Sequence, residues 1–140
     1  MFLVLLFFHS IVRWLLLTSL GCSLFISGRK YLKKLPFTKS DDSLRHWTAT
    51  IAHVQLMIGM VMYFKTGIDE IFFFKFIHIS LMITAIIMIT IGSALSKRQE
   101  EEQAKFRLLL IFYGTALFII FCAIPWPFSA LAQRPLFRNF

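Results

Sequence analysis

The fold is decided by residues 71–95, which read IFFFKFIHISLMITAIIMITIGSAL. A bilayer hydrocarbon core of about 30 Å needs about 20 apolar residues in an α-helix, and the ionisable side chains of this stretch are only Lys75 and His78. Three further stretches are apolar over a similar length: residues 2–26, 47–64 and 108–124. The sequence therefore predicts four membrane-spanning helices.

Composition leaves little room for anything else. The 140 residues are 58% hydrophobic, and their mean hydropathy is +0.74. The connections between the four apolar stretches are too short for a separate soluble domain. We expect one all-α transmembrane domain over residues 1–140, folded as an integral membrane four-helix bundle with up-down topology.

Basic residues indicate the orientation of this bundle. Of fifteen Lys and Arg, ten lie in two segments on the same side of the predicted membrane, residues 27–46 and 96–107. Because basic loops stay in the cytoplasm, we expect both termini outside. The net charge of +8 is then explained by topology and by contact with anionic headgroups. We expect no nucleic-acid partner, since no binding motif accompanies the basic residues.

Three histidines lie inside the predicted spans: His9, His53 and His78. An ionisable ring in hydrocarbon costs free energy, so such residues are candidates for a functional site. At 1.5 Å per residue, His9 and His78 lie roughly 10 and 11 Å from the outer ends of their spans, and His53 about 16 Å. The first and third helices of an up-down bundle are diagonal neighbours. We therefore predict that His9 and His78 are the axial ligands of a haem iron, with His53 as the competing ligand.

Arg13 follows His9 by one helical turn and shares its face of the helix. The seven acidic residues all lie in connections or at span ends, so we expect its counter-ion to come from outside the chain. A haem propionate would be a suitable bidentate partner. Two alternatives stay open: Arg13 snorkels to a lipid headgroup, or it pairs with another subunit.

Other interpretations of the histidines are open as well. They can bond helices together through neighbouring polar side chains, for which Thr50, Gln55, Ser80 and Thr84 are available. Met57 and Met82 follow His53 and His78 by one turn, and thioethers beside imidazoles suit copper(I). His46 lies at the inner edge of the second span, where we expect an interfacial role. Without a zinc or nucleophile motif, an electron-transfer or accessory subunit is expected before an independent enzyme.

Several short motifs together resemble a family of small four-helix membrane proteins of Bacteroidetes-type bacteria, whose members are often called cytochrome b-like. These motifs are His9-Ser10 with Arg13-Trp14, Ala52-His53-Val54-Gln55-Leu56, Ile58-Gly59, Tyr63-Phe64, His78 and Ile124-Pro125-Trp126-Pro127-Phe128. The chain departs from the family before its third span, where residues 76–80 replace a Glu-His-Pro pattern.

The resemblance implies a haem-associated or respiratory function in the bacterial inner membrane, with His9, His53 and His78 at the family's histidine positions. We expect a b-type haem protein that carries electrons as a subunit of a larger respiratory complex. Two other classes remain open at this stage. One is an accessory subunit without a cofactor, and the other is a copper-handling membrane protein.

Overall fold

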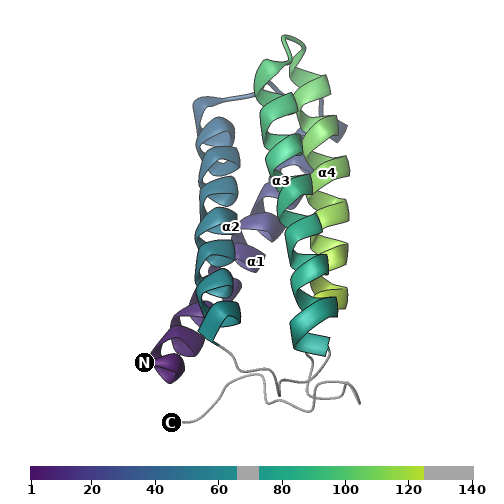
Figure 1. Cartoon of the computed structure of the whole chain (residues 1–140). Coiled ribbons are helices and arrows are strands. Elements are labelled where there is room, and N and C mark those ends of the chain that lie inside the picture. Colours follow the sequence, from purple (N-terminus) through teal and green to yellow (C-terminus); the bar gives the residue numbers. More distant parts are fainter. Residues whose placement is uncertain (66–72, 125–140) are drawn as a thin grey trace.

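The computed structural model describes residues 1–65 and 73–124, with side chains for residues 1–65 and 76–124. Every described element is helical (Figure 1). In chain order they are α1 (Phe2–Leu32), α2 (Lys39–Lys65), the π-helix η1 (Phe73–His78), α3 (Ile79–Arg98) and α4 (Glu102–Ala123). The prolines of the 124–128 motif and Trp126 lie outside the described residues.

The prediction of four apolar helices is confirmed, because each of the four is long and apolar enough to cross a membrane. The helices are longer than the predicted spans at their polar ends: α1 continues from residue 26 to Leu32, and α2 begins at Lys39 instead of 47. Lys and Arg are good helix formers, so a helix can continue beyond the apolar stretch. The fold indicates a multi-pass membrane protein.

A tight cap ends α1. The amide of Leu35 donates to the carbonyl of Lys30 at 3.0 Å, which is the long bond of a Schellman motif. Lys34 takes a left-handed backbone conformation with φ 51°, which glycine would adopt with less strain. Pro36 follows and cannot extend the helix. The chain therefore turns sharply here toward the start of α2.

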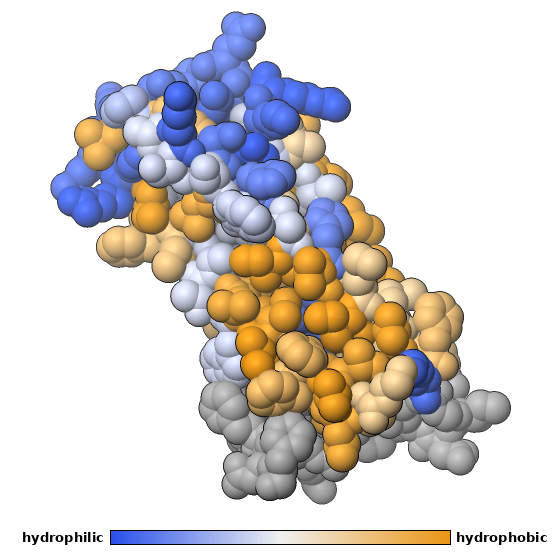
Figure 2. All heavy atoms as spheres, turned by 90° about the vertical axis from the view of Figure 1, so that its left-hand side faces the viewer, coloured by the Kyte–Doolittle hydropathy of each residue, from blue (hydrophilic) through white to orange (hydrophobic). Residues whose placement is uncertain are grey.

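The four helices occupy the corners of a bundle, with α1 opposite α3 and α2 opposite α4. α1 contacts α2 and α4, and α3 contacts the same two helices, whereas α1 and α3 share no extensive contact. Figure 1 shows α1 crossing obliquely behind α2 and α3. Polar side chains gather at the end that holds the α1–α2 and α3–α4 connections, and an apolar band lies below them (Figure 2). This exterior is compatible with contact to a lipid bilayer.

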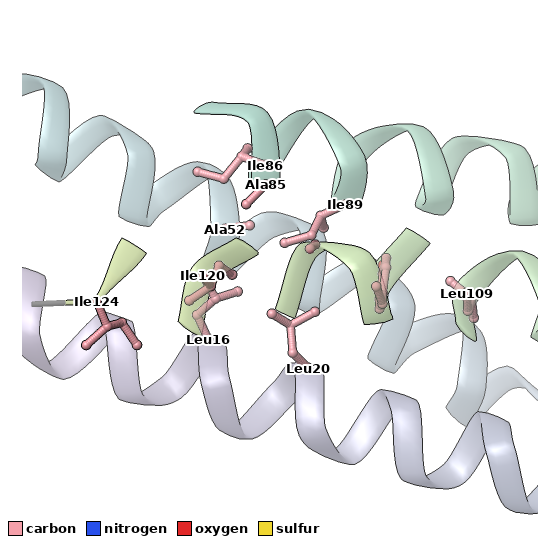
Figure 3. Packing of buried hydrophobic residues seen from close by; sticks show 11 residues of the cluster. Leu16, Leu20, Ala52, Ala85, Ile86, Ile89, Leu109, Ile120 and Ile124 are labelled. Carbon is pink, nitrogen blue, oxygen red and sulfur yellow. The ribbon is translucent and has the colours of Figure 1, made fainter. Parts of the chain in front are cut away.

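All four helices contribute to one apolar core. Leu16 and Leu20 of α1 lie against Ile89 of α3 and Leu109 and Ile120 of α4, and Figure 3 shows these side chains directed into the same interior. Ala52 of α2 and Ala85 of α3 add small, fully buried side chains to the same core. Small residues at such contacts allow the dispersion attraction between membrane helices to develop.

A buried arginine joins three helices near the polar end. Arg45 of α2 donates to the Asp42 carboxylate at 2.7 Å and to Ser93 Oγ of α3 at 2.6 Å. Its own carbonyl accepts the hydroxyl proton of Tyr113 of α4 at 3.0 Å. Each partner satisfies a polar group that would be costly to bury alone. Arg45 is therefore part of the packing of the bundle as well as of the basic segment that contains it.

A second polar junction ties α1 to the start of α2. Asp41 Oδ2 accepts from Lys30 Nζ at 2.6 Å and from the amide and hydroxyl of Thr38 at 2.7 and 2.8 Å. Asp41 lies before the apolar stretch that begins at Trp47. Burial alone would raise the pKa of Asp41, but the hydrogen bonds from Lys30 and Thr38 outweigh it and hold the pKa below its usual value.

We expect Asp41→Asn to lower the free energy of unfolding at neutral pH by about 2 kcal/mol, because charge-assisted hydrogen bonds are lost. A carboxyl with a lowered pKa stabilises the fold fully above its unfolded-state pKa of about 3.9, and this contribution disappears as the pH falls through the lower folded-state pKa. Unfolding in detergent, followed by circular dichroism across the acid range, measures both effects. The exposed Glu101 provides the control variant Glu101→Gln, and equal stability of the two variants would contradict this role of Asp41.

Candidate functional site

His9 of α1 is bonded to Gln55 of α2. The Gln55 amide nitrogen lies 3.2 Å from His9 Nε2 and donates to the His9 carbonyl at 3.0 Å. Because an amide nitrogen only donates, His9 Nε2 is the acceptor of the first bond, and the neutral ring carries its proton on Nδ1. Both amide protons of Gln55 are thus used on one residue of the neighbouring helix.

The other side of the His9 ring faces Gly59. A Cβ atom at Gly59 would lie 3.4 Å from His9 Cε1 and 3.8 Å from Nδ1, so glycine leaves the ring space beside α2. Two buried atoms here, His9 Nδ1 and Gln55 Oε1, have no hydrogen-bond partner among the described residues. Buried polar atoms of this kind mark a place where a ligand, an ion or a proton exchange can be accommodated.

His78 lies at the start of the helix opposite α1 in the bundle. It is the last residue of η1, directly before α3, and its Nδ1 donates to the carbonyl of Ala123 in α4 at 2.7 Å. A carbonyl can only accept, so the neutral ring carries its proton on Nδ1 and its lone pair on Nε2. This is the second-shell bond that commonly orients a histidine whose Nε2 coordinates a metal.

Arg13 lies one turn after His9 on α1 and donates to Ser10 Oγ at 3.3 Å. Its guanidinium also lies 5.5 Å from the ring centroid of Trp14. His9 interacts electrostatically with both Arg13 and His78, and His78 interacts with Arg13. These three predicted site residues therefore lie within electrostatic range of one another. We call His9, Arg13, Gln55 and His78 the histidine cluster.

His53 lies elsewhere, on the outside of the bundle between α2 and α3. Its Nδ1 donates to the carbonyl of Ala49 at 2.7 Å, and its Nε2 lies 3.2 Å from Thr90 Oγ1. Of the methionines relevant to copper, Met57 is 69% exposed, whereas Met82 packs against the core. His53 and its neighbours thus form a separate region from the histidine cluster.

Within the described ranges, no group of three or more His, Cys, Asp or Glu side chains is arranged to hold a metal ion. A haem iron with two axial imidazoles needs only two such residues. Cys22 and Cys122 are both free. The ion pairs recorded for residues 1–65 and 76–124, Lys30–Asp41 and Arg45–Asp42, lie at the polar end of the bundle.

Sequence reasoning found some partners and missed others. Gln55 was one of four side chains expected to be available to a histidine, and it bonds His9. Thr50 and Thr84 instead donate to carbonyls of their own helices. The burial of Arg45 was missed, since a basic residue six positions after Lys39 looks like part of an exposed connection. Its i,i+3 spacing from Asp42 was the one available signal.

Comparison with family models, with curated proteins and with solved structures finds no match for this chain.

Proposed function

We propose that this protein is a b-type haem-binding membrane subunit that carries electrons, with His9 and His78 as the axial ligands. The observation that supports the proposal is an electrostatic interaction between His9 and His78, although α1 and α3, the helices beside which they lie, occupy opposite corners of the bundle. A flat macrocycle is held by two imidazoles that approach from opposite faces. Two opposite helices can supply such a pair.

The chemistry of the cluster fits this prosthetic group. The bond from His78 Nδ1 to the Ala123 carbonyl fixes the tautomer with a lone pair on Nε2, as an iron ligand requires. His9 can offer Nε2 once Gln55 gives up its hydrogen bond to that atom, and the second Gln55 bond to the His9 carbonyl would hold the residue in place. Gly59 keeps the space beside the ring clear.

Arg13 contributes positive charge beside both rings. A guanidinium suits the carboxylate of a propionate, to which it can donate two parallel hydrogen bonds. A bound haem supplies a reversible one-electron couple in a site of low dielectric. The role of Arg13 would be to neutralise a propionate and to set the position of the ring relative to α1.

The wider setting is part of the same proposal. We infer an up-down bundle in a bacterial inner membrane with both termini outside, because the basic connections 27–46 and 96–107 would then face the cytoplasm. The resemblance to cytochrome b-like proteins supports attachment to a larger respiratory complex. Such an assembly would provide the electron donor and acceptor.

The experiment is a reduced-minus-oxidised absorption spectrum of protein purified from its native membrane. We expect the absorption bands of a b-type haem at about one haem per chain, since the proposal assigns one pair of axial histidines. Protein that is intact, folded and purified with its natural partners, yet lacks haem absorption, would contradict the proposal.

The hydrogen bonds that His9 and His78 make to neighbouring helices favour a second function, that of an accessory subunit without a cofactor. The Gln55–His9 bonds join α1 to α2, and the His78–Ala123 bond joins the start of α3 to the end of α4. Such bonds contribute about 0.6 kcal/mol each to membrane helix packing. An accessory subunit without a cofactor would use the histidines in this way, and it would co-purify with stoichiometric partners and no haem.

A further inference from the structure

A groove of about 300 Å³ lies between α2 and α3, away from the histidine cluster. The residues that line it are His46, Ala49, Thr50, His53, Thr90, Ser93 and Ala94. Its volume is at the lower end of the range of ligand pockets, roughly 300–1,000 Å³. Ala49 and Ala94 have small side chains, so the groove between them has room for a single aromatic ring.

The groove runs from the inner end of the predicted second span toward the middle of that span. It extends from His46, next to the exposed Trp47, to His53, a rise of about 10 Å along α2. His53 and Thr90 are both exposed on the outside of the bundle. A ligand would therefore enter from the membrane, with a polar head at this depth and an apolar tail in the lipid.

The two threonine hydroxyls of the groove donate their protons to carbonyls of their own helices. Thr50 donates to the His46 carbonyl at 3.0 Å, and Thr90 donates to the Ile86 carbonyl at 2.8 Å. Ser93 Oγ accepts from Arg45 at 2.6 Å. The two threonines consequently offer lone pairs to a ligand, since each hydroxyl has only one proton.

His53 offers a lone pair as well. Its Nδ1 proton is donated to the Ala49 carbonyl, so the neutral ring has an acceptor at Nε2. That atom lies 3.2 Å from Thr90 Oγ1, and the single proton of Thr90 cannot serve both His53 Nε2 and the Ile86 carbonyl fully. His53 Nε2 and Thr90 Oγ1 therefore lack one hydrogen-bond donor between them.

We propose that this groove binds a membrane-dissolved phenol, an aromatic ring with a hydroxyl donor and an apolar tail. The phenol hydroxyl donates to His53 Nε2 and Thr90 Oγ1, which act together as acceptors. The aromatic ring of the ligand lies between the small side chains of Ala49 and Ala94. A molecule that carries only acceptors would find no proton there. The inference concerns a second site and stands independently of haem binding.

The test uses the full chain in nanodiscs of phosphatidylcholine, with ¹⁵N-labelled histidine and without oxygen. The probes are a hydroquinone with a short alkyl tail and its dimethyl ether, which has the same ring and no donor. We expect saturable binding of the hydroquinone with a shift of the His53 Nε2 resonance, and binding of the ether at least about tenfold weaker, the effect of one lost hydrogen bond to a desolvated partner. Equal binding of the two probes, or none, would overturn the proposal.

Two variants test the residues. Thr90→Val keeps the shape of the side chain and removes the acceptor, so hydroquinone affinity should fall about tenfold. Thr84→Val is the matched control, because Thr84 lies on the same helix, donates to its own i−4 carbonyl and does not line the groove. An equal loss in both variants would contradict the assignment.

A hydroxyl group of a lipid is the other possible source of a hydrogen-bond donor to the groove. Phosphatidylglycerol presents hydroxyl donors at the headgroup level, nearest to the His46 end of the groove. Replacing part of the phosphatidylcholine with it introduces these donors without a phenol. We expect little change in the His53 resonance and no competition with the hydroquinone. A shift produced by phosphatidylglycerol and not by the hydroquinone would overturn the phenol proposal.

Discussion

His78→Ala should remove the haem absorption of the purified protein. The substitution deletes one of the two proposed axial nitrogens together with the hydrogen bond to the Ala123 carbonyl, and a b-type haem is held by its axial ligands without a covalent link. The measurement is haem per chain, from the reduced-minus-oxidised spectrum and a protein assay. We expect the ratio to fall by at least about tenfold, the effect of roughly 1.4 kcal/mol in binding.

Four further variants make this result specific. His46→Ala, at the polar end of α2, should retain the haem, and so should His53→Ala, because His53 lies in the α2–α3 groove with Thr90. The smaller variant His78→Gly should regain absorption when free imidazole is added, which a misfolded protein would not do. Loss of haem in His53→Ala and its retention in His9→Ala would contradict His9 as an axial ligand and assign His53 in its place.

Gly92→Ala should destabilise the bundle strongly. A Cβ atom at Gly92 of α3 would lie 2.4 Å from Phe112 Cβ of α4 and 3.1 Å from Phe112 Cγ, so the two backbones would have to separate. Overpacking in a well-filled interior costs about 1–3 kcal/mol. We expect a fall of this size in the free energy of unfolding, measured by titration of the micellar protein with a denaturing detergent and followed by circular dichroism.

Gly21→Ala is the control for this substitution. A Cβ atom at Gly21 of α1 meets nothing within 4 Å, and alanine is the better helix former by about 1 kcal/mol. Stability should therefore stay the same or rise slightly. If both variants unfold alike, the close contact between α3 and α4 is not the source of the stability that we assign to it.

The four helices could be predicted because a bilayer imposes one requirement on a whole segment, about 20 apolar residues in a row. That requirement says nothing about where a helix ends in water, and the helices continue to Leu32 and begin at Lys39 beyond the predicted limits. The stop of α1 depends on the local cap at Lys34. No hydropathy pattern indicates this cap.

The equal depth of His9 and His78 is a prediction that rests on counting residues at 1.5 Å each along a helix. Which way a ring points around its helix depends on packing against other helices. His53 illustrates this, since it is only about one turn deeper than the other two and lies outside the bundle in the groove with Thr90. Gln55, between the two environments, faces inward to His9.

The partners of buried polar groups were the least predictable part. Arg45 and Tyr113 are far apart in the sequence and meet only because α2 and α4 lie across the interior from each other. The close approach at Gly92 is similarly set by the opposing residue, Phe112. Glycine is common in membrane helices. The sequence alone therefore does not indicate that Gly92, among the glycines of the apolar spans, is the one in close contact with Phe112.

The most direct test is near-infrared magnetic circular dichroism of the oxidised protein taken from its native membrane, because this spectrum distinguishes pairs of axial haem ligands. The proposed site predicts the signal of a low-spin haem with two imidazole ligands, absent in both His9→Ala and His78→Ala. A signal from any other ligand pair, or a folded protein without a haem signal, would contradict the convergence of His9 and His78 on one prosthetic group.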